Sequence, residues 1–306
     1  MFLITSKVII DYFQSGGGND IVDVNGIENN SDTGAGDDQI TLTGKFGSGS
    51  SLDGKSLNAG DGDDTISLLG GSYSGTHWYD ESWYGTTDYL HALANNYSWS
   101  EAVSIVRGGT GNDTIIVGNA EDYGIIEGNE GHDIINASEA NNVYRIFGGD
   151  GNDTITGTDS PDHIDGGNQN DLIDANNGDD YVNGGYGDDQ ITSTGGDNEL
   201  FGGDGDDIII SGDGKDIIQG GNGDDQITAG RGNDVIYGNN DSQPSNSDSE
   251  IDTVILSGRA ADYSISRITV SIFGDVYYLR DIREGSPDGV DCLLYTSDAA
   301  DEGLGV

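Results

Sequence analysis

An uninterrupted run of ten nine-residue repeats, from Gly148 to Tyr237, constrains the fold of this chain more than any other feature. Its clearest copies read GGDGNDTIT, GGYGDDQIT, GGDGDDIII and GGNGDDQIT. The sixth position is Asp in every copy except one, where it is Asn198, and the eighth position is always Ile, Leu or Val. A phase kept over ten copies predicts one supersecondary unit that stacks on itself.

The residue types at each position indicate what that unit is. Glycines at positions one, two and four permit positive φ and close backbone approach, so positions one to six suit a tight turn. Positions seven to nine alternate polar, apolar and polar, as in Thr154–Thr156, which predicts a short strand with one buried face. Two units per coil predict an all-β fold, a parallel β-roll (β-solenoid) with eighteen residues per turn and two facing rows of Ile and Val.

The stacking brings acidic side chains together. Strands of successive turns lie about 4.8 Å apart, so each position-six Asp lies over the Asp eighteen residues later. Two carboxylates about 5 Å apart repel each other by roughly 3 kcal/mol at an effective dielectric constant near 20. A hard divalent cation between turns reverses this sign. Calcium accepts six to eight oxygens, which two carboxylates and turn carbonyls supply, whereas magnesium demands a stricter octahedron.

Broken copies of the repeat precede the regular run, at Ser15–Asp23, Thr33–Thr41, Ala59–Ser67, Gly108–Ile116 and Gly128–Asn136. The last two and the first regular copy start twenty residues apart, which predicts the same solenoid with one edge loosened and calcium on the intact edge. We therefore predict multiple Ca²⁺ ions. The expected side-chain ligands are Asp20, Asp38, Asp64, Asp113, Asp133, Asp153, Asp162, Asp171, Asp180, Asp189, Asp207, Asp216, Asp225 and Asp234. The expected carbonyl ligands are those of Gly149, Gly151, Gly185, Gly187, Gly203, Gly205, Gly212, Gly214, Gly221 and Gly223.

Asn198 interrupts one of the two rows of position-six residues. It keeps an oxygen ligand but lacks the full negative charge on which affinity in calcium sites depends. We therefore predict that the two sites sharing Asn198, with Asp180 and with Asp216, are the weakest or are empty.

Composition excludes several classes of partner. The 306 residues carry a formal net charge of −45, a sign that disfavours nucleic acid and anionic membranes as direct partners. No apolar run approaches membrane-spanning length, so we expect no membrane insertion and a monomeric protein. The opening MFLITSKVII is too short a hydrophobic stretch for a signal peptide and is better interpreted as an opening strand or as the arbitrary edge of a longer gene product.

The stretch Leu68–Arg107 interrupts the repeat and holds all three tryptophans. Helical patterns occur at Asp88–Asn95 and Ser100–Val106. Two interpretations stay open. The aromatic residues could pack on the flank of the solenoid, or they could form a sugar-binding platform with polar residues among them, namely His77, Asp80, Glu81 and His91.

No catalytic motif is present: HExxH, GxSxG and P-loop spacings are absent, and the Asp-Asp pairs recur in register with the repeat. We predict that the chain is not an enzyme. His132 and His163 fall at variable positions, and we expect both to be solvated. The alternative function is a polysaccharide-binding adhesin or polysaccharide-modifying enzyme that uses residues 68–107.

After the repeats, a polar linker (238–250) leads to Ile251–Asp291, where strand-like runs predict a small antiparallel cap. These runs are Thr253–Leu256, Tyr263–Phe273 and Val276–Asp281. The tail Cys292–Val306 resembles a translated sequencing adapter, so we expect it to take no part in folding and its deletion to leave calcium binding unchanged. The expected division is irregular repeats 1–67, insertion 68–107, loosened repeats 108–147, regular repeats 148–237, linker 238–250, cap 251–291 and tail 292–306.

The nonapeptides resemble the calcium-binding repeats of the RTX (repeats-in-toxin) family, and SGRAADYSI and SPDGVD resemble the segment that follows those repeats in secreted bacterial RTX proteins. The resemblance implies a haemolysin-type calcium-binding β-roll within a larger, type I-secreted protein. Such a roll would fold outside the cell on binding calcium and would stabilise or cap an attached module. A glycan or cell surface is a further candidate partner.

Overall fold

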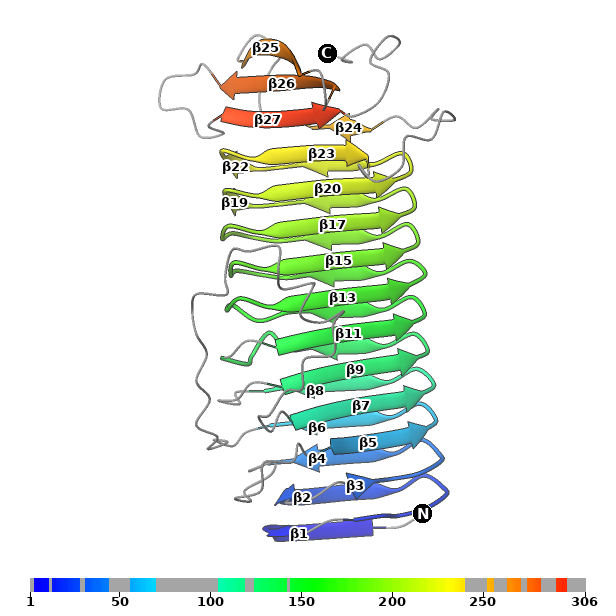
Figure 1. The fold of residues 1–306 in the computed structure, drawn as a ribbon. Coiled ribbons are helices and arrows are strands. Elements are labelled where there is room, and N and C mark those ends of the chain that lie inside the picture. The colour runs from blue at the N-terminus through cyan, green and yellow to red at the C-terminus, as the bar shows by residue number, and fades with distance from the viewer. Residues whose placement is uncertain are drawn as a thin grey trace.

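The structure is a computed structural model that describes residues 3–10, 13–27, 31–43, 56–69, 104–118, 124–141, 144–239, 252–255, 263–270, 274–281 and 290–295. These residues form a tall stack of flattened coils with the N-terminal strand at one end (Figure 1). All of the regular secondary structure in the described residues is β-strand. The predicted all-β, parallel solenoid is therefore confirmed.

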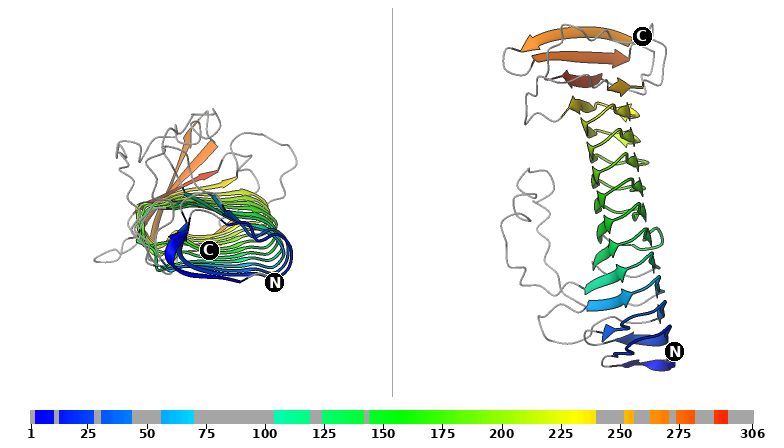
Figure 2. Two further views of the ribbon diagram at one scale, coloured as in Figure 1. Left: turned by 90° about the horizontal axis from the view of Figure 1, so that it is seen from below. Right: turned by 90° about the vertical axis from the view of Figure 1, so that its right-hand side faces the viewer.

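Two long sheets face each other across the coil, as the view along its axis shows (Figure 2). The twelve-stranded sheet comprises β1 (Leu3–Ile10), β2 (Ile21–Ile27), β4 (Gln39–Leu42), β6 (Thr65–Leu68), β8 (Thr114–Val117), β10 (Ile134–Asn136), β12 (Thr154–Thr156), β14 (Leu172–Asp174), β16 (Gln190–Thr192), β18 (Ile208–Ile210), β21 (Gln226–Thr228) and β24 (Thr253–Val254).

The thirteen-stranded sheet lies opposite. It comprises β3 (Ser31–Asp32), β5 (Ser56–Asp61), β7 (Ser104–Thr110), β9 (Gly124–Glu130), β11 (Tyr144–Asp150), β13 (His163–Asn168), β15 (Tyr181–Tyr186), β17 (Glu199–Asp204), β20 (Ile217–Asn222), β23 (Val235–Asn239), β25 (Tyr263–Val270), β26 (Gly274–Asp281) and β27 (Val290–Tyr295). A small third sheet pairs β19 (Asp213–Gly214) with β22 (Arg231–Gly232).

Strand register follows the repeat. In the regular run Ile155 pairs with Ile173, and Val182 pairs with Leu200, each eighteen residues later and parallel. The residue at the eighth position is therefore stacked on its counterpart in the next coil. Every such residue from Ile155 to Ile236 is at most 1% exposed, and together they form the two rows of the core. Full burial of each aliphatic side chain contributes about 1.5–3 kcal/mol relative to exposure.

Insertions leave this register intact. Gln39 pairs with Thr65, Thr65 pairs with Thr114, and Thr114 pairs with Ile134, so coils of 26, 49 and 20 residues present equivalent strands. The interruption predicted at Leu68–Arg107 overlaps both neighbouring strands, because Leu68 lies in β6 and Arg107 lies in β7. One expectation there is wrong: Ser104–Val106, assigned to a helical pattern, lie in β7. The other expected helix and the three tryptophans lie outside the described residues.

The C-terminal region differs from expectation in two ways. Strand β24 is parallel to β21 and adds one more coil to the solenoid. Strands β25, β26 and β27 pair antiparallel with one another, but β27 is parallel to β23, so they extend the thirteen-stranded sheet and do not form a separate cap. The tail was expected to take no part in the fold. This is wrong for Cys292–Tyr295, which lie in β27, and Cys292–Leu294 pair with β23.

Candidate calcium sites along two edges

Two rows of turns connect the sheets. We call edge A the row that holds Asp20, Asp38, Asp64, Asp113, Asp133, Asp153, Asp171, Asp189, Asp207, Asp225 and Asp252. Edge B is the row that holds Asp162, Asp180, Asn198, Asp216 and Asp234. All fourteen predicted Asp ligands lie in these turns, at the points where the chain enters or leaves a strand.

The aspartates of edge A form a continuous hydrogen-bonded ladder. The backbone N–H of each residue donates to Oδ1 of the equivalent Asp one coil later, with N···O distances of 2.7–2.9 Å from Asp20 to Asp225. Insertions of different length do not interrupt it. The ladder fixes one oxygen of each carboxylate and aims the other into the turn.

That second oxygen defines the candidate metal site. Seven edge A aspartates have a buried Oδ2 with no hydrogen-bond partner, and each of these residues is 3% exposed or less. They are Asp64, Asp113, Asp133, Asp153, Asp171, Asp189 and Asp207. An unpaired carboxylate oxygen inside a protein is strongly unfavourable. A repeated row of such oxygens is the donor set that a hard cation satisfies.

The glycine at position one leaves room for this oxygen. A Cβ atom added to Gly148, Gly184 or Gly202 would overlap Oδ2 of the Asp five residues later and a glycine carbonyl in the next coil. Any side chain at this position would therefore collide with both a carboxylate and the backbone. These glycines lie outside the left-handed region, so steric space and not positive φ accounts for them.

Positions two and four do require the left-handed conformation. Gly203 and Gly205 have φ of 124° and 135°, and an added Cβ would overlap the carbonyl oxygen one coil earlier. Gln169, which replaces a turn glycine, still adopts φ of 74°. Eight of the ten predicted carbonyl ligands belong to such edge A turns. The other two, Gly212 and Gly214, are on edge B and lie outside the left-handed region.

The pKa values of the edge A carboxyl groups indicate that a nearby positive charge would stabilise this edge. Burial, reinforced by neighbouring aspartates, raises the pKa of Asp113 to about 7 and the pKa values of Asp171 and Asp207 to about 8. The ladder hydrogen bonds lower these values but do not offset desolvation. Without a cation, these carboxyl groups would hold protons near neutral pH.

Side chains alone do not complete a site. The described residues contain no group of three or more His, Cys, Asp or Glu side chains that could hold a metal ion. An ion on edge A must therefore take backbone carbonyls besides its two carboxylates, as the sequence predicts. Edge A fits calcium on this test, because its donors are all oxygens and seven of its carboxylates have a buried Oδ2 without a protein partner.

The edge B turns are built differently. Asp180 has a buried, unpartnered Oδ2 and a pKa that burial raises to about 8. At Asp162 the backbone N–H of Thr158 donates to Oδ2, with an N···O distance of 2.6 Å. At Asp216 the hydroxyl of Ser211 donates to Oδ2. Two of the predicted edge B ligands therefore already have protein partners for the oxygen that is unpartnered on edge A.

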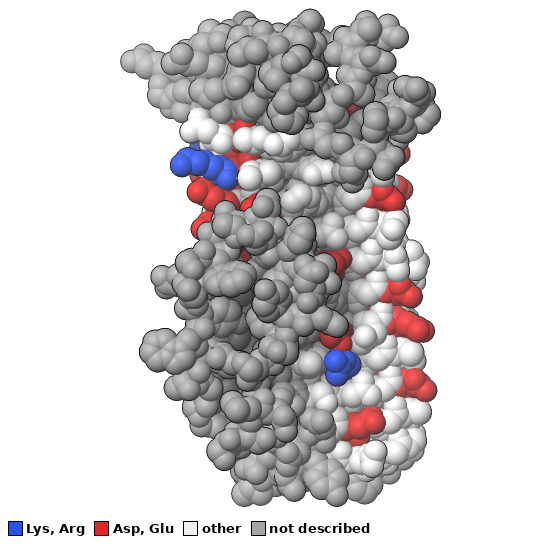
Figure 3. All heavy atoms as spheres, in the orientation of Figure 1, with Lys and Arg blue, Asp and Glu red and all other residues white. Residues whose placement is uncertain are grey.

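Position-five side chains form a second, exposed ladder on edge A. The backbone N–H of Asp206 donates to Oδ1 of Asp188, and the backbone N–H of Asp224 donates to Oδ1 of Asp206, at 3.0 and 2.9 Å. Acidic side chains also appear at intervals along this side of the molecule (Figure 3). Position five was expected to be exposed, and Asp188 and Asp206 are.

One ladder residue was missed. Asp252 follows the linker, and the backbone N–H of Asp225 donates to its Oδ1 at 3.2 Å. Gly238 serves as its position-one glycine, since an added Cβ there would overlap Oδ2 of Asp252. The signal was present in the sequence, because Asp252–Val254 repeats the Asp-x-apolar order of positions six to eight.

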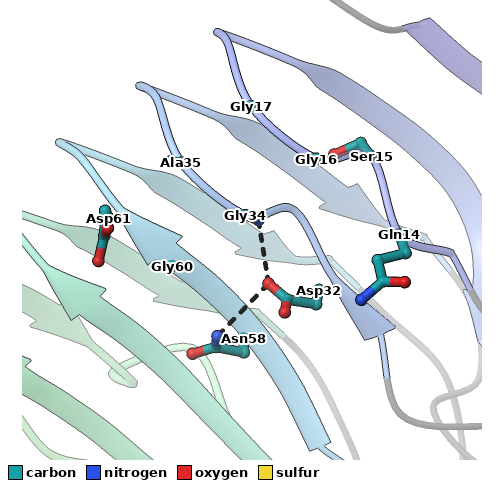
Figure 4. Close-up of a pocket in the computed structure, with 10 residues that line it drawn as sticks. All are labelled: Gln14, Ser15, Gly16, Gly17, Asp32, Gly34, Ala35, Asn58, Gly60 and Asp61. Atoms are coloured by element: carbon teal, nitrogen blue, oxygen red, sulfur yellow. Dashed lines mark hydrogen bonds between the residues drawn. The ribbon is translucent and has the colours of Figure 1, made fainter.

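Two further polar features lie beside the ladder of edge A aspartates or in the thirteen-stranded sheet. A hollow beside the first edge A turns is lined by Gln14, Ser15, Gly16, Gly17, Asp32, Gly34, Ala35, Asn58, Gly60 and Asp61 (Figure 4). Oδ1 of its Asp32 carboxylate accepts hydrogen bonds from the Gly34 N–H and from Asn58 Nδ2. His132 is exposed as expected, but His163 is buried and stacked on Tyr181 with ring centroids 4.7 Å apart. Burial lowers the pKa of His163 to about 4.

The coil, the paired glycine turns and the acidic ladder define a parallel β-solenoid with calcium-binding turns. A model of the RTX calcium-binding nonapeptide repeat matches residues 56–73, 104–123, 125–144, 147–182, 183–218 and 210–242, half of the chain. The chain belongs to the RTX calcium-binding nonapeptide-repeat family. Among solved structures it is similar to a hyperactive, Ca²⁺-dependent, β-helical antifreeze protein from an Antarctic bacterium. That similarity has 15% identity and a TM-score of 0.28, over 85% of this chain and 75% of that one. Comparison with curated proteins gives no match.

Proposed function

We propose that this chain is the calcium-binding β-roll of a larger secreted bacterial protein, and that it folds outside the cell when calcium binds. The observation that carries the proposal is the row of seven buried, unpartnered carboxylate oxygens on edge A. The ladder forces these carboxylates into one line, and calcium supplies the positive charge that the protein itself lacks. Several ions per chain follow, because the arrangement recurs in successive coils.

The formal charge of −45 supports a chain that stays unfolded where calcium is scarce. Extracellular calcium modules bind with dissociation constants of about 10⁻⁴–10⁻³ M, so they fill outside the cell and not within it. This behaviour suits type I secretion, in which the chain would leave the cell before folding. The folded roll would then stabilise or cap an attached module.

We further propose that the roll is monomeric and has no catalytic role of its own. The buried aspartates support this, because each recurs in register with the repeat and belongs to a structural ladder. The described residues contain no helix long and apolar enough to cross a membrane. The residues on which the alternative depends, a glycan platform around Trp78 and Trp83, lie outside the described part of the chain.

Circular dichroism of the purified chain tests the proposal. In EDTA we expect a largely unfolded spectrum, and on adding millimolar calcium we expect a cooperative gain of β-structure. Magnesium at the same concentration should produce much less, because it gives up its water ligands reluctantly. The same strand signal in EDTA and in calcium would refute the proposal.

A further inference from the structure

The side-chain amide of Asn198, on edge B, is surrounded by oxygen atoms that accept its hydrogen bonds. Its side-chain Nδ2 lies 2.9 Å from Ser193 Oγ, 3.0 Å from the carbonyl oxygen of Gly196 and 3.0 Å from Asp216 Oδ1. Asn198 is 1% exposed, so water does not compete for these contacts. The amide donor thus lies among a hydroxyl, a turn carbonyl and a carboxylate of the next coil.

The orientation of this amide is fixed by its other end. The backbone N–H of Asp180 donates to Asn198 Oδ1 at 3.0 Å, as one step of the edge B ladder. Because an N–H requires an oxygen acceptor, Oδ1 must face Asp180 and Nδ2 must face the three oxygens. The ladder therefore keeps its geometry while the amide nitrogen takes the position that the second carboxylate oxygen has on edge A.

The next coil is closed in the same way. Asp216 accepts on Oδ1 from Asn198, through both the side chain and the backbone N–H at 2.9 Å, and on Oδ2 from the Ser211 hydroxyl. Neither oxygen of this buried carboxylate lacks a partner. Ser193 and Ser211 both occupy position one, where the matching edge A residues Gly184 and Gly202 have no side chain.

We propose that the Asn198 amide replaces a calcium ion on edge B, so that the coils of Asn198 and Asp216 are joined by hydrogen bonds and bind no calcium between them. A neutral residue between two aspartates removes the like-charge contact that makes a cation necessary. Its N–H group bonds to the carbonyl and the carboxylate oxygen that an ion would otherwise coordinate. Ser193 and Ser211 complete the replacement. This inference rests on the proposed function, since it concerns which turns take the metal.

Counting bound calcium by native mass spectrometry in millimolar calcium tests it. Asn198→Asp restores a carboxylate between Asp180 and Asp216, and we expect at least one more ion per chain than in the wild type. Asn198→Ala removes both the amide and the oxygen ligand, and we expect the count to stay unchanged while the thermal midpoint falls. Asp207→Asn is the matched change on edge A, and it should remove at least one ion.

The outcomes separate the two proposals. If Asn198→Ala loses an ion, or if Asn198→Asp binds the same number as the wild type, then edge B already holds calcium at Asn198 and this inference is wrong. Should Asn198→Asp fail to fold, the Asn198→Ala count alone decides. A wild-type chain that binds no calcium at all would overturn the proposed function, and this inference with it.

Discussion

Edges A and B carry the same repeat in the same phase, yet they resolve the same electrostatic problem by different chemistry. On edge A, Asp171, Asp189 and Asp207 each have one oxygen in the ladder and one buried oxygen without a partner. On edge B, the equivalent Nδ2 of Asn198 donates to Asp216 Oδ1, and Oδ2 of Asp216 accepts from the Ser211 hydroxyl. The backbone ladder is common to both edges and therefore does not determine which turns need an ion.

The difference can be traced to two positions of the nonapeptide. Position one is glycine on edge A from Gly108 to Gly220, which leaves Oδ2 facing a bare Cα atom. On edge B position one varies, from Gly157 and Ala175 to Ser193 and Ser211, and the two serine hydroxyls contact the position-six side chain. Position six is the second difference, because the side-chain amide of Asn198 carries an N–H donor that an aspartate carboxylate lacks. The repeat thus specifies the coil, and at Asn198 and Asp216 the residues at positions one and six supply hydrogen bonds that the edge A turns lack.

The largest expected effect is that of pH on the metal-free protein. Folding raises the pKa of Asp64 to about 6, of Asp113 to about 7 and of Asp207 to about 8, from a usual value of 3.8. A raised pKa in the folded state stabilises the fold below the unfolded value, and this stability is lost as pH rises through 6 to 8. In a chelator, strand content should therefore be higher at pH 4 than at pH 8.

Circular dichroism across this range, with and without calcium, measures the effect. Saturating calcium should remove most of the pH dependence above pH 6, because the ions replace the protons. Metal-free protein that is equally folded at pH 4 and pH 8 would show that the edge A carboxyls are not desolvated as the structure indicates.

The next effect compares Asp207 with Asp216, one from each edge. Asp207→Ala removes a ligand shared by two edge A sites, so we expect fewer bound ions and a calcium midpoint shifted several-fold upward. Asp216→Ala removes hydrogen-bond acceptors of Asn198 and Ser211, which should lower stability by about 1–3 kcal/mol without changing the ion count. Calcium titrations and thermal unfolding measure the two quantities separately. Equal losses of calcium in both variants would contradict the distinction between the edges.

A smaller effect is expected at the start of edge A. Asp38→Ala interrupts the same ladder as Asp207→Ala, but near its N-terminal end, where few coils depend on it. Stability in a solenoid passes through nearest neighbours, so central damage costs more than damage at an end. The shift of the calcium midpoint should therefore be larger for Asp207→Ala. Circular dichroism during a calcium titration measures both midpoints. Equal shifts of the calcium midpoint in the two variants would mean that the coils do not fold as one stacked unit.

The sequence was sufficient to predict the coil and edge A. The spacing of Asp153, Ile155 and their equivalents defines the register, and the ladder follows once the strands are parallel. It also predicted that the copies spaced by twenty residues belong to the same solenoid. These features depend on local periodicity, which any stacked repeat must satisfy.

Other features depend on contacts between residues that the period does not relate. Asp252 was missed because the stretch 238–250 interrupts the nine-residue spacing of the repeat. The hydrogen-bond ladder nevertheless continues from Asp225 to Asp252. Strand β27 was missed because Cys292–Tyr295 were set aside on their resemblance to an adapter, a criterion that says nothing about pairing with β23. The hydroxyl contacts of edge B could not be predicted either, since serine at position one is equally compatible with a solvated turn.

The smallest expected effect isolates position one itself. Ser193→Ala removes one of three acceptors of the Asn198 amide and leaves the Gly196 carbonyl and Asp216 at 3.0 Å, so the loss should be about 1 kcal/mol. The calcium midpoint should not move, because no ion is involved. Gly202→Ala is the matched change on edge A, where the new Cβ would overlap Asp207 Oδ2 and the Gly220 carbonyl. This variant should weaken calcium binding as well as stability. A calcium midpoint that shifts for Ser193→Ala as it does for Gly202→Ala would show that both edges coordinate the ion, and that serine at position one is only a tolerated replacement for glycine.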